Sequence, residues 1–438
     1  MKRVCCLLLF LCLYNISGAQ QKVTINGKDD YIYPVSITDD SLSSLQPLKE
    51  LFASKQIVAL GEATHGTREF MQLKIAFLKF LITSCGYRSV IAEVPFGAML
   101  FLDDYVTEGT GDVDAALRNV GFWGLYTAEF RDFINWTKNY NKGRPIGDKV
   151  HLWGMDMQTL LDPLFYLQMK AGMLPADAKA GFETVVQPLL EDKKQSGNIS
   201  TTMLSDSLKS KSEIVAARLQ QWTRDNQQII EATYSRQGAG VWQLCVQNFV
   251  YSIHLYGNYA FYRDSCMAAN VTALTGLIQQ RSAVWAHNEH VGRHDSIVNY
   301  ANLRKMMGEF LHHTFKDKYY PVGFLFERGS FLAMEEKVEK TKIVFPNLRV
   351  FSLSANANNK LAADLSGLSN SPFFIDLTNS SNSTWRQFHP FYIGGAIQRR
   401  KQSERLYRTP ALVFSALVFV PETTAIVQID NYFRPTVK

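Results

Sequence analysis

Along this chain, hydrophobic and polar residues are arranged in successive blocks whose patterns predict strands alternating with helices. Short, almost wholly apolar runs are typical of buried strands, and they occur at residues 56–60, 89–92, 150–153 and 281–286. Longer stretches carry apolar residues at helical spacing, which predicts helices at residues 68–83, 96–106 and 130–140. Strands that alternate with helices in this way indicate βαβ units built around a parallel sheet.

The stretch from residue 158 to 278 is rich in Gln, Lys, Glu, Ala and Leu and has a helical period. We interpret it as a long helical insertion with a loop at residues 193–202. A polar leader covers 20–40, and later apolar runs predict strands at residues 319–326, 343–351, 373–377 and 411–420. The predicted fold is α/β, with a parallel-sheet core, helices on both sides, and the insertion as one wall of the active-site cleft.

The first residues have the pattern of an export signal. Lys2 and Arg3 precede an apolar run at residues 4–13, and Ser17-Gly18-Ala19 offers small residues for cleavage. The alternative, a membrane anchor, needs about 20 apolar residues to span a bilayer. We therefore expect residues 1–19 to be a signal peptide. The mature protein, residues 20–438, is expected to be one periplasmic or secreted domain without stable membrane insertion.

Composition and charge narrow the class of protein. Of 438 residues, 46% are hydrophobic and 20% are charged, as in ordinary globular proteins. The net charge of +6 comes without the dense Lys/Arg stripe that nucleic-acid binding needs, so no nucleic-acid partner is expected. Three cysteines, Cys85, Cys245 and Cys266, follow the signal segment, and an odd number excludes a fully paired intrachain framework.

Ionisable residues stand just past the carboxyl ends of the first four predicted strands. In open parallel sheets, ligands bind outside the carboxyl ends of the strands, so these residues are candidates for one active site. The candidates are Glu62 and His65 after the first strand, Glu93 after the second, Asp156 after the third, and His287 and His290 after the fourth.

Each candidate also has a purely structural interpretation. Glu62 suits a surface acid and His65 the start of a helix, while Glu93 suits a buried salt bridge. Asp156 suits a helix N-cap. Arg263, on a predicted helix, would ordinarily be exposed.

The two histidines that follow the fourth strand leave further alternatives open. His287 and His290 suit either satisfied core histidines or, together with Glu62 and His65, a metal site. Neither H-E-x-x-H nor its inverse is present.

Several familiar catalytic motifs are absent from the sequence. It has no G-x-S-x-G elbow, no G-x-x-x-x-G-K-[ST] phosphate loop and no G-x-G-x-x-G after a strand. No cysteine nucleophile with a histidine partner stands out. Clustered histidines and carboxylates without a covalent nucleophile favour a hydrolase that activates water.

Blocks of the chain, taken together and in order, resemble the erythromycin esterase family. The resemblance runs from about residue 50 to 310 and rests on these segments: LGEATHGTREF (60–70), AEVPF (92–96), the stretch from Trp123 to Glu129, Trp136 with Asn141, LWGMDMQ (152–158), YRDSCMAANV (262–271) and WAHNEHVGR (285–293).

The resemblance implies an ester hydrolase whose known members open the macrolactone of macrolide antibiotics, a resistance activity. It implies water activation without an acyl-enzyme or an obligatory metal, so no cofactor is expected, and the partner would be a small-molecule ester. His65 would be the general base and Glu62 its orienting acid. Two other readings stay open: a metal- or heme-binding protein, and a metal-dependent hydrolase on the same fold.

Further roles carried over from the family concern the remaining blocks. Glu93 matches the second carboxylate, His287 the second essential histidine, and Arg263 an arginine that faces the cleft, and these three join the predicted catalytic set. His290 and Asp156 are predicted to support the site by binding substrate.

Overall fold

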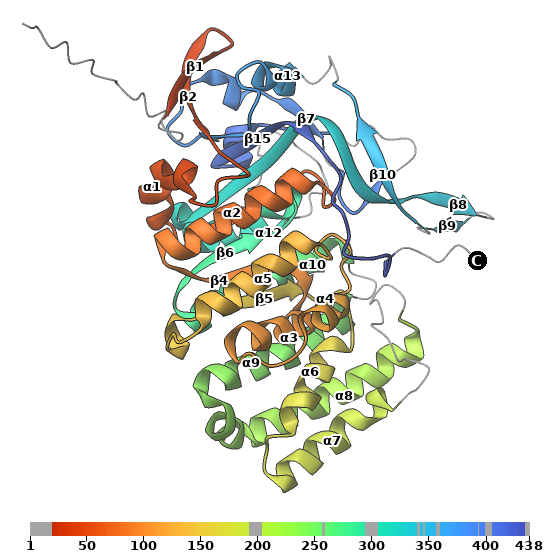
Figure 1. Ribbon diagram of the computed structural model, residues 1–438. Coiled ribbons are helices and arrows are strands. Elements are labelled where there is room, and N and C mark those ends of the chain that lie inside the picture. Colours follow the sequence, from red (N-terminus) through yellow and green to blue (C-terminus); the bar gives the residue numbers. More distant parts are fainter. Residues whose placement is uncertain are drawn as a thin grey trace, which may run out of the picture.

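The computed structural model describes most of the chain in one folded body (Figure 1). The described residues are 20–191, 204–255, 259–293, 305–339, 342–344, 347–355, 360–392, 394–398 and 405–433. The predicted signal peptide (1–19) and the predicted loop at 193–202 lie outside the described residues.

One mixed sheet runs through the molecule, and its central part is parallel as predicted. Six adjacent strands run parallel in the order β15 (Ala416–Thr423), β7 (Tyr319–Glu335), β3 (Ile57–Leu60), β6 (Arg281–Trp285), β4 (Tyr87–Pro95) and β5 (His151–Asp156). Beyond β15 the sheet continues antiparallel through β11 (Phe373–Asp376), β2 (Lys28–Pro34) and β1 (Gln21–Ile25). The four strands predicted around the candidate site, β3 to β6, are therefore neighbours.

The region that follows β7 differs in part from the prediction. The predicted strand at 343–351 is two separate strands, β9 (Lys342–Val344), which pairs with β8 (Lys337–Glu339), and β10 (Leu348–Leu353), which is antiparallel to β7. Two short pairings complete this region: β13 (Ile397–Gln398) beside β7, and β12 (His389–Tyr392) with β14 (Arg405–Arg408).

Two other predicted segments also differ. The predicted strand at 411–420 starts late because α14 (Pro410–Val413) comes first, with Pro410 at its first position, where a missing N–H costs nothing. The predicted polar leader contains the β1–β2 hairpin. Asn26 and Gly27 turn it with φ of 51° and 76°, which is the left-handed turn that Asn-Gly favours.

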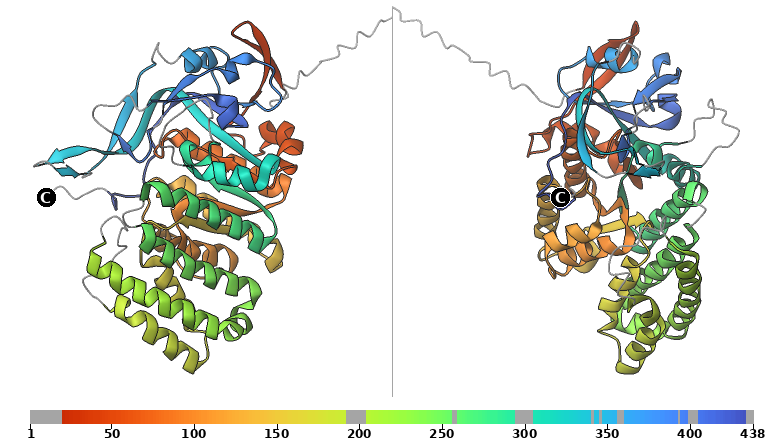
Figure 2. Two further views of the ribbon diagram at one scale, coloured as in Figure 1. Left: turned by 180° about the vertical axis from the view of Figure 1, so that it is seen from behind. Right: turned by 90° about the vertical axis from the view of Figure 1, so that its right-hand side faces the viewer.

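Helices cover both faces of the parallel strands, as predicted (Figures 1 and 2). Alternate strand residues point to opposite faces, so Val58 and Leu60 of β3 join one buried cluster while Ile57 and Ala59 join the other. The first cluster includes residues of α1 (Lys49–Ala53), α2 (Arg68–Cys85), α4 (Val113–Val120) and α5 (Ala128–Asn141). The second includes residues of the helical insertion and of α12 (Met307–Phe315) and α13 (Lys360–Ser366). Helix α3 (Phe96–Thr107) lies beyond the edge strand β5 and contributes to both clusters.

The predicted insertion between β5 and β6 consists mainly of helices where it is described. It comprises α6 (Asp162–Ala171), α7 (Ala176–Leu190), α8 (Asp206–Asp225), α9 (Gln227–Leu255) and α10 (Tyr259–Ile278). Figure 1 shows α6 to α9 extending away from the sheet, while α10 packs against β4, β5 and β6. The insertion thus contributes α10 as one wall beside the carboxyl ends of these strands.

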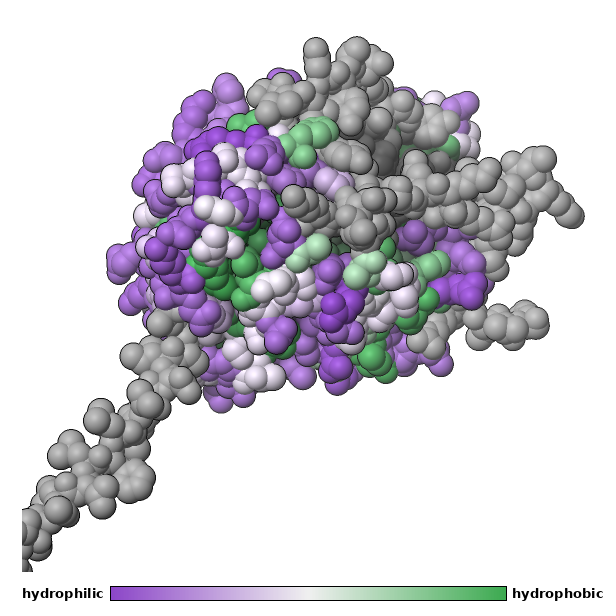
Figure 3. Space-filling view, turned by 90° about the horizontal axis from the view of Figure 1, so that it is seen from above, coloured by the Kyte–Doolittle hydropathy of each residue, from purple (hydrophilic) through white to green (hydrophobic). Residues whose placement is uncertain are grey.

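The hydrophilic surface and the buried cysteines are consistent with this packing of apolar residues in the interior. The end of the molecule that carries β1 and β2 is mainly hydrophilic where its residues are described, with small separate hydrophobic areas (Figure 3). Cys85, Cys245 and Cys266 are buried and free of disulfides. Among the helices of the described residues, none is both long and apolar enough to cross a lipid bilayer.

Gly66 lets strand β7 pass directly against the loop that follows β3. Its carbonyl accepts hydrogen bonds from the amides of Leu332 at 2.9 Å and Ile426 at 3.0 Å. A Cβ atom at Gly66 would lie 1.8 Å from the Leu332 carbonyl oxygen and 2.7 Å from its amide nitrogen. Because those atoms belong to the backbone of a central strand, no side-chain rotation can relieve the clash.

Gly66→Ala is therefore expected to destabilise the fold by about 3 kcal/mol, the upper range for overpacking a core. Urea denaturation at neutral pH would measure this loss. Gly147→Ala is the matched control, since a Cβ atom at Gly147 meets nothing within 4 Å, and it should change the free energy of unfolding by less than about 0.5 kcal/mol. Equal effects of the two substitutions would contradict the role assigned to Gly66.

Candidate active site

The carboxyl ends of β3, β4, β5 and β6 bring together all seven residues predicted from the sequence. Glu62 and His65 lie in the loop between β3 and α2, and Glu93 lies near the end of β4. Asp156 is the last residue of β5, and Arg263 comes from α10 of the insertion. His287 is the N-cap of the short helix α11 (Asn288–Val291), which follows β6, and His290 lies within this helix. Hydrogen bonds divide these residues into two groups, one around His65 and one around Glu93.

His65 is held by a carboxylate on one side of its ring. Its Nδ1 lies 2.6 Å from Oε1 of Glu62, in the same loop. This contact favours a proton on Nδ1, which leaves Nε2 with a lone pair. Nε2 makes no hydrogen bond with the described residues, and the ring stands edge-on to Phe122 with centroids 5.2 Å apart. The arrangement gives one oriented imidazole whose outer nitrogen is available as a base.

Beneath this pair lies Lys74, which sequence reasoning missed. The Lys74 side chain is fully buried, and its Nζ donates to Oε2 of Glu62 at 2.7 Å and to the Ala286 carbonyl at 3.3 Å. The ammonium also stands 4.5 Å from the centre of the Trp285 ring, within the range of a cation–π contact. The sequence does carry a signal for the burial of Lys74, because this residue lies in the apolar stripe of α2, four residues after Phe70 and four before Leu78.

The charges of Lys74 and Glu62 depend on each other. Burial acts to raise the pKa of Glu62, but Lys74 and His65 together hold it below its ordinary value. Burial lowers the pKa of Lys74 to about 8, against the attraction of Glu62. Both groups are therefore charged at neutral pH, so Glu62 accepts the hydrogen bond of His65 as an ionised carboxylate.

The second group is an ionic network around Glu93. Nη2 of Arg263 lies 2.7 Å from Oε1 of Glu93 and 2.7 Å from Oδ2 of Asp156. Nε of Arg263 donates to Oδ1 of Asp156 at 3.1 Å, so the guanidinium meets Asp156 with two parallel bonds. Only 8% of the Arg263 side chain is exposed. Burial acts to raise the pKa of Glu93, but His290 and Arg263 hold it well below its ordinary range.

His290 is the second cation of this network. Its Nδ1 lies 2.6 Å from Oδ1 of Asp264, and its Nε2 lies 3.2 Å from Oε1 of Glu93. Burial acts to lower its pKa, yet the two carboxylates raise the pKa of His290 to about 10. A protonated ring donates to both carboxylates, and Nη1 of Arg263 is then a close neighbour at 3.1 Å rather than a donor.

His287 connects the two groups and is neutral. Its amide donates to Oε2 of Glu93 at 2.9 Å, and its Nε2 donates to the Ala63 carbonyl at 3.2 Å. Nδ1 accepts from the Glu289 amide at 3.3 Å, which fixes the proton on Nε2. Burial, with the nearby His65, lowers the pKa of His287 to about 3. The rings of His287 and His65 lie 5.2 Å apart between centroids.

The predicted residues therefore differ in what they can contact. Among the described residues, Nε2 of His65 has no hydrogen-bond partner, whereas Arg263, Asp156 and His290 are more than nine-tenths buried and contact other side chains. Arg68, which received no role from the sequence, pairs with Glu129 at 2.9 Å. Within the described ranges, no group of three or more His, Cys, Asp or Glu residues has the arrangement of a metal site.

Lys74→Met is expected to lower the free energy of unfolding by about 3–5 kcal/mol, because it leaves the buried carboxylate of Glu62 without its cation. Lys79→Met, on the same helix but half-buried, removes an equal charge without a buried ion pair and should cost less than about 1 kcal/mol. Urea denaturation of both variants at pH 7 tests this. A Lys74→Met protein as stable as Lys79→Met would show that the pair does not hold the site together.

Comparisons with known proteins place this chain in a family. The model of the family described as erythromycin esterase matches residues 82–423, a range that contains Glu93, Asp156, Arg263, His287 and His290 and begins after Glu62 and His65. Two curated relatives match over shorter segments. The erythromycin esterase type II of Escherichia coli is 27% identical over 131 residues, 30% of this chain and 30% of that protein. The putative hydrolase YbfO of Bacillus subtilis (strain 168) is 24% identical over 148 residues, 33% of this chain and 31% of that protein.

Solved structures match almost the whole chain at low identity and so support the fold. A Bacillus cereus protein has a TM-score of 0.72 at 20% identity, covering 91% of this chain and 96% of its own. A structure titled as a succinoglycan biosynthesis protein has a TM-score of 0.70 at 20% identity, covering 90% and 95%. A mutant of the erythromycin esterase EreC in its open conformation has a TM-score of 0.64 at 15% identity, covering 91% and 99%. Because the family model spans most of the chain, this protein belongs to the erythromycin esterase family.

Proposed function

We propose that this protein is an exported carboxylic ester hydrolase in which His65 activates a water molecule. The observation that carries the proposal is the 2.6 Å contact between His65 Nδ1 and Glu62, while Nε2 has no hydrogen-bond partner in the part of the chain that the structure describes. An imidazole oriented by a carboxylate, with its other nitrogen free, is suited to general-base catalysis near neutral pH. Membership of the erythromycin esterase family supports an ester as substrate.

The reaction follows from the proton positions around His65. Nε2 of His65 takes a proton from water, and Glu62 stabilises the imidazolium that forms. The hydroxide adds to the ester carbonyl to give a tetrahedral intermediate. Its collapse breaks the bond to the alkoxide, which takes the proton from His65, so that one ester and one water give one acid and one alcohol. Lys74 contributes by keeping Glu62 ionised.

His287 is the best-placed donor for the developing oxyanion or the leaving oxygen. Its ring lies 5.2 Å from that of His65, and its Nε2 carries the proton now donated to the Ala63 carbonyl. A neutral imidazole can stabilise an oxyanion without giving up its proton, and one such donor contributes about 3–4 kcal/mol. Glu93, held by Arg263 and His290, accepts from the His287 amide and thereby fixes its position. In this proposal Arg263, Asp156 and His290 act indirectly, because they hold Glu93 and the cleft wall in position.

The substrate is proposed as an ester or a macrolactone. The similarity to the erythromycin esterase type II of Escherichia coli spans about a third of that protein, so a macrolide is one member of the panel to be tested. The metal-dependent alternative is tested by the same experiment, through chelation.

The mature chain, residues 20–438, is expected to hydrolyse at least one member of a panel of simple esters and macrolactones. His65→Ala should lower kcat/KM by about 100-fold or more, in the range of a lost general base. His313→Ala, at an exposed histidine, is the matched control and should keep the wild-type rate. Activity that survives His65→Ala would exclude the proposed base. Activity that is lost with a chelator and restored by zinc or manganese would instead establish a metal-dependent hydrolase.

Export is proposed from the basic and apolar pattern of residues 1–19. Expressed with residues 1–438 in a bacterial host, the protein is expected in the periplasm or medium with Gln20 as its first residue. Mass spectrometry of the N-terminal peptide measures the cleavage position, and a chain that starts at Gln20 after an initiator Met should stay in the cytoplasm. An uncleaved chain recovered with the membrane fraction would support an anchor.

A further inference from the structure

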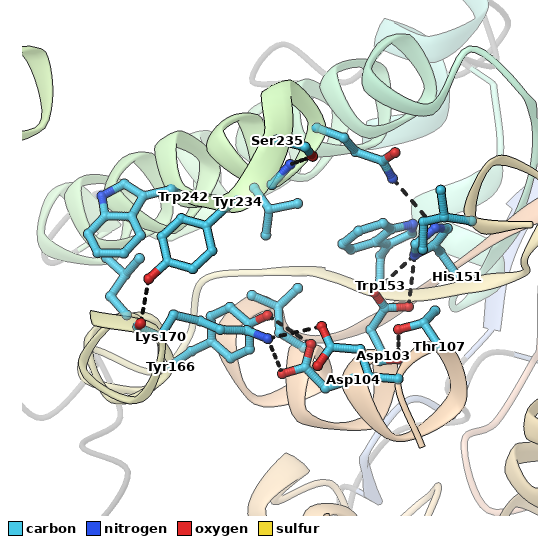
Figure 4. Close-up of a pocket in the computed structure, with 17 residues that line it drawn as sticks. Asp103, Asp104, Thr107, His151, Trp153, Tyr166, Lys170, Tyr234, Ser235 and Trp242 are labelled. Atoms are coloured by element: carbon cyan, nitrogen blue, oxygen red, sulfur yellow. Dashed lines mark hydrogen bonds and ion pairs between the residues drawn. The ribbon is translucent and has the colours of Figure 1, made fainter. Parts of the chain in front are cut away.

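A cavity lies beside the start of β5, at the opposite end of this strand from Asp156 of the candidate active site. Figure 4 shows the residues that line it. The cavity has a volume of about 190 Å³ and is lined by β5 and by parts of α3, α6 and α9. His151, at the start of β5, lines the cavity, while Asp156, at the end of that strand, belongs to the active site. Five steps along a strand span about 17 Å, so the two sites are separate.

Aromatic rings form opposite walls of this cavity, as Figure 4 shows. On one side the rings of His151 and Trp153 stack at 5.0 Å and 15°. They face the same way because they are two residues apart on one strand. On the other side Tyr234 and Trp242 stack at 5.7 Å and 25°. A flat or aliphatic body of a ligand would fit between these two pairs.

Carboxylates form the floor between the walls. Asp104 accepts from the Tyr166 hydroxyl at 3.1 Å and pairs with Nζ of Lys170 at 2.9 Å. Next to it, Asp103 pairs with His151 Nδ1 at 3.0 Å. Asp103 and Asp104 are both more than nine-tenths buried.

The charges around the cavity favour a cation. Asp103, Asp104 and Glu108 line it with three carboxylates, against one lysine, Lys170, and His151. Burial raises the pKa of Asp104 to about 6, with Lys170 opposing, so an added cation would favour its ionised form.

Two further features suggest that the cavity is built for a ligand rather than left by loose packing. The Trp153 side chain lines the cavity and is 1% exposed, yet its indole N–H has no hydrogen-bond partner among the described residues. A buried donor without a partner is costly, and an acceptor on a ligand would satisfy it. On the rim, Ser235 interrupts α9 with φ 67° and ψ 170°, a conformation that is strained for a non-glycine residue and clusters at ligand sites.

We propose that this cavity binds a small organic amine whose apolar body lies between the two stacked aromatic pairs and whose ammonium faces Asp104. An oxygen on the ligand would accept from the Trp153 indole. The volume is slightly larger than the roughly 150 Å³ that holds a benzene molecule in a protein core, so one ring with a short aminoalkyl arm fits.

Tyramine is the probe that matches these features, and 4-propylphenol has the same shape without the ammonium. Isothermal titration of the mature chain is expected to show one saturable site for tyramine and at least tenfold weaker binding of 4-propylphenol. Phenethylamine, which lacks the phenol oxygen, should bind more weakly than tyramine. Equal affinity for tyramine and 4-propylphenol would overturn the proposal, as would no binding of tyramine.

Variants locate the binding in this cavity. Asp104→Asn should weaken tyramine binding at least fivefold and leave 4-propylphenol unchanged, whereas Asp132→Asn, at an exposed position of α5, should change neither. Because Asp104→Asn also removes one of the two ion pairs of Lys170, a second variant, Gln237→Trp, fills the cavity from α9 and should abolish tyramine binding. Circular dichroism checks that each variant is folded. Tyramine affinity that survives Gln237→Trp would place the ligand elsewhere. His65→Ala protein should bind tyramine as the wild type does, so this test is independent of ester hydrolysis.

Discussion

The ion pair between Lys74 and Glu62, buried beneath His65, is the interaction on which the candidate site depends. Burying either charge without the other would carry a large desolvation cost, so each residue stabilises the other in the core. The Glu62 oxygen left over from this pair meets Nδ1 of His65. One buried lysine on α2 thus sets the charge of a carboxylate, and that carboxylate sets the orientation of a histidine.

The same principle organises the other half of the site. Arg263 and His290 bring two positive charges to the three carboxylates Glu93, Asp156 and Asp264. Glu93 is the member that reaches out of this network, because its second oxygen accepts from the His287 amide. The helical insertion takes part through α10, which carries Arg263, so this wall of the cleft is tied to the strand ends by charge as well as by packing.

Sequence patterns were sufficient where local physics decides the structure. Four apolar runs became the adjacent parallel strands β3 to β6, and the residues just past their ends met at one edge of the sheet. The structure differs from the hydrophobic pattern where short-range turn chemistry decides, as at Asn26-Gly27 in the β1–β2 hairpin and at Pro410, which starts α14 ahead of β15. Both signals were present in the sequence.

By itself, the sequence determined the four parallel strands β3 to β6 with the helices that flank them, and which ionisable residues stand just past the carboxyl ends of these strands. Periodicity and chain order carry that information, because parallel strands must share an edge for their carboxyl ends. Only the tertiary structure decided the partners: that Lys74 lies under Glu62, that His290 is held between Glu93 and Asp264, and that His287 is neutral. The physical reason is that the cost of burying a charge depends on its neighbours, and these come from distant segments of the chain, such as Glu93 and His287, which are 194 residues apart.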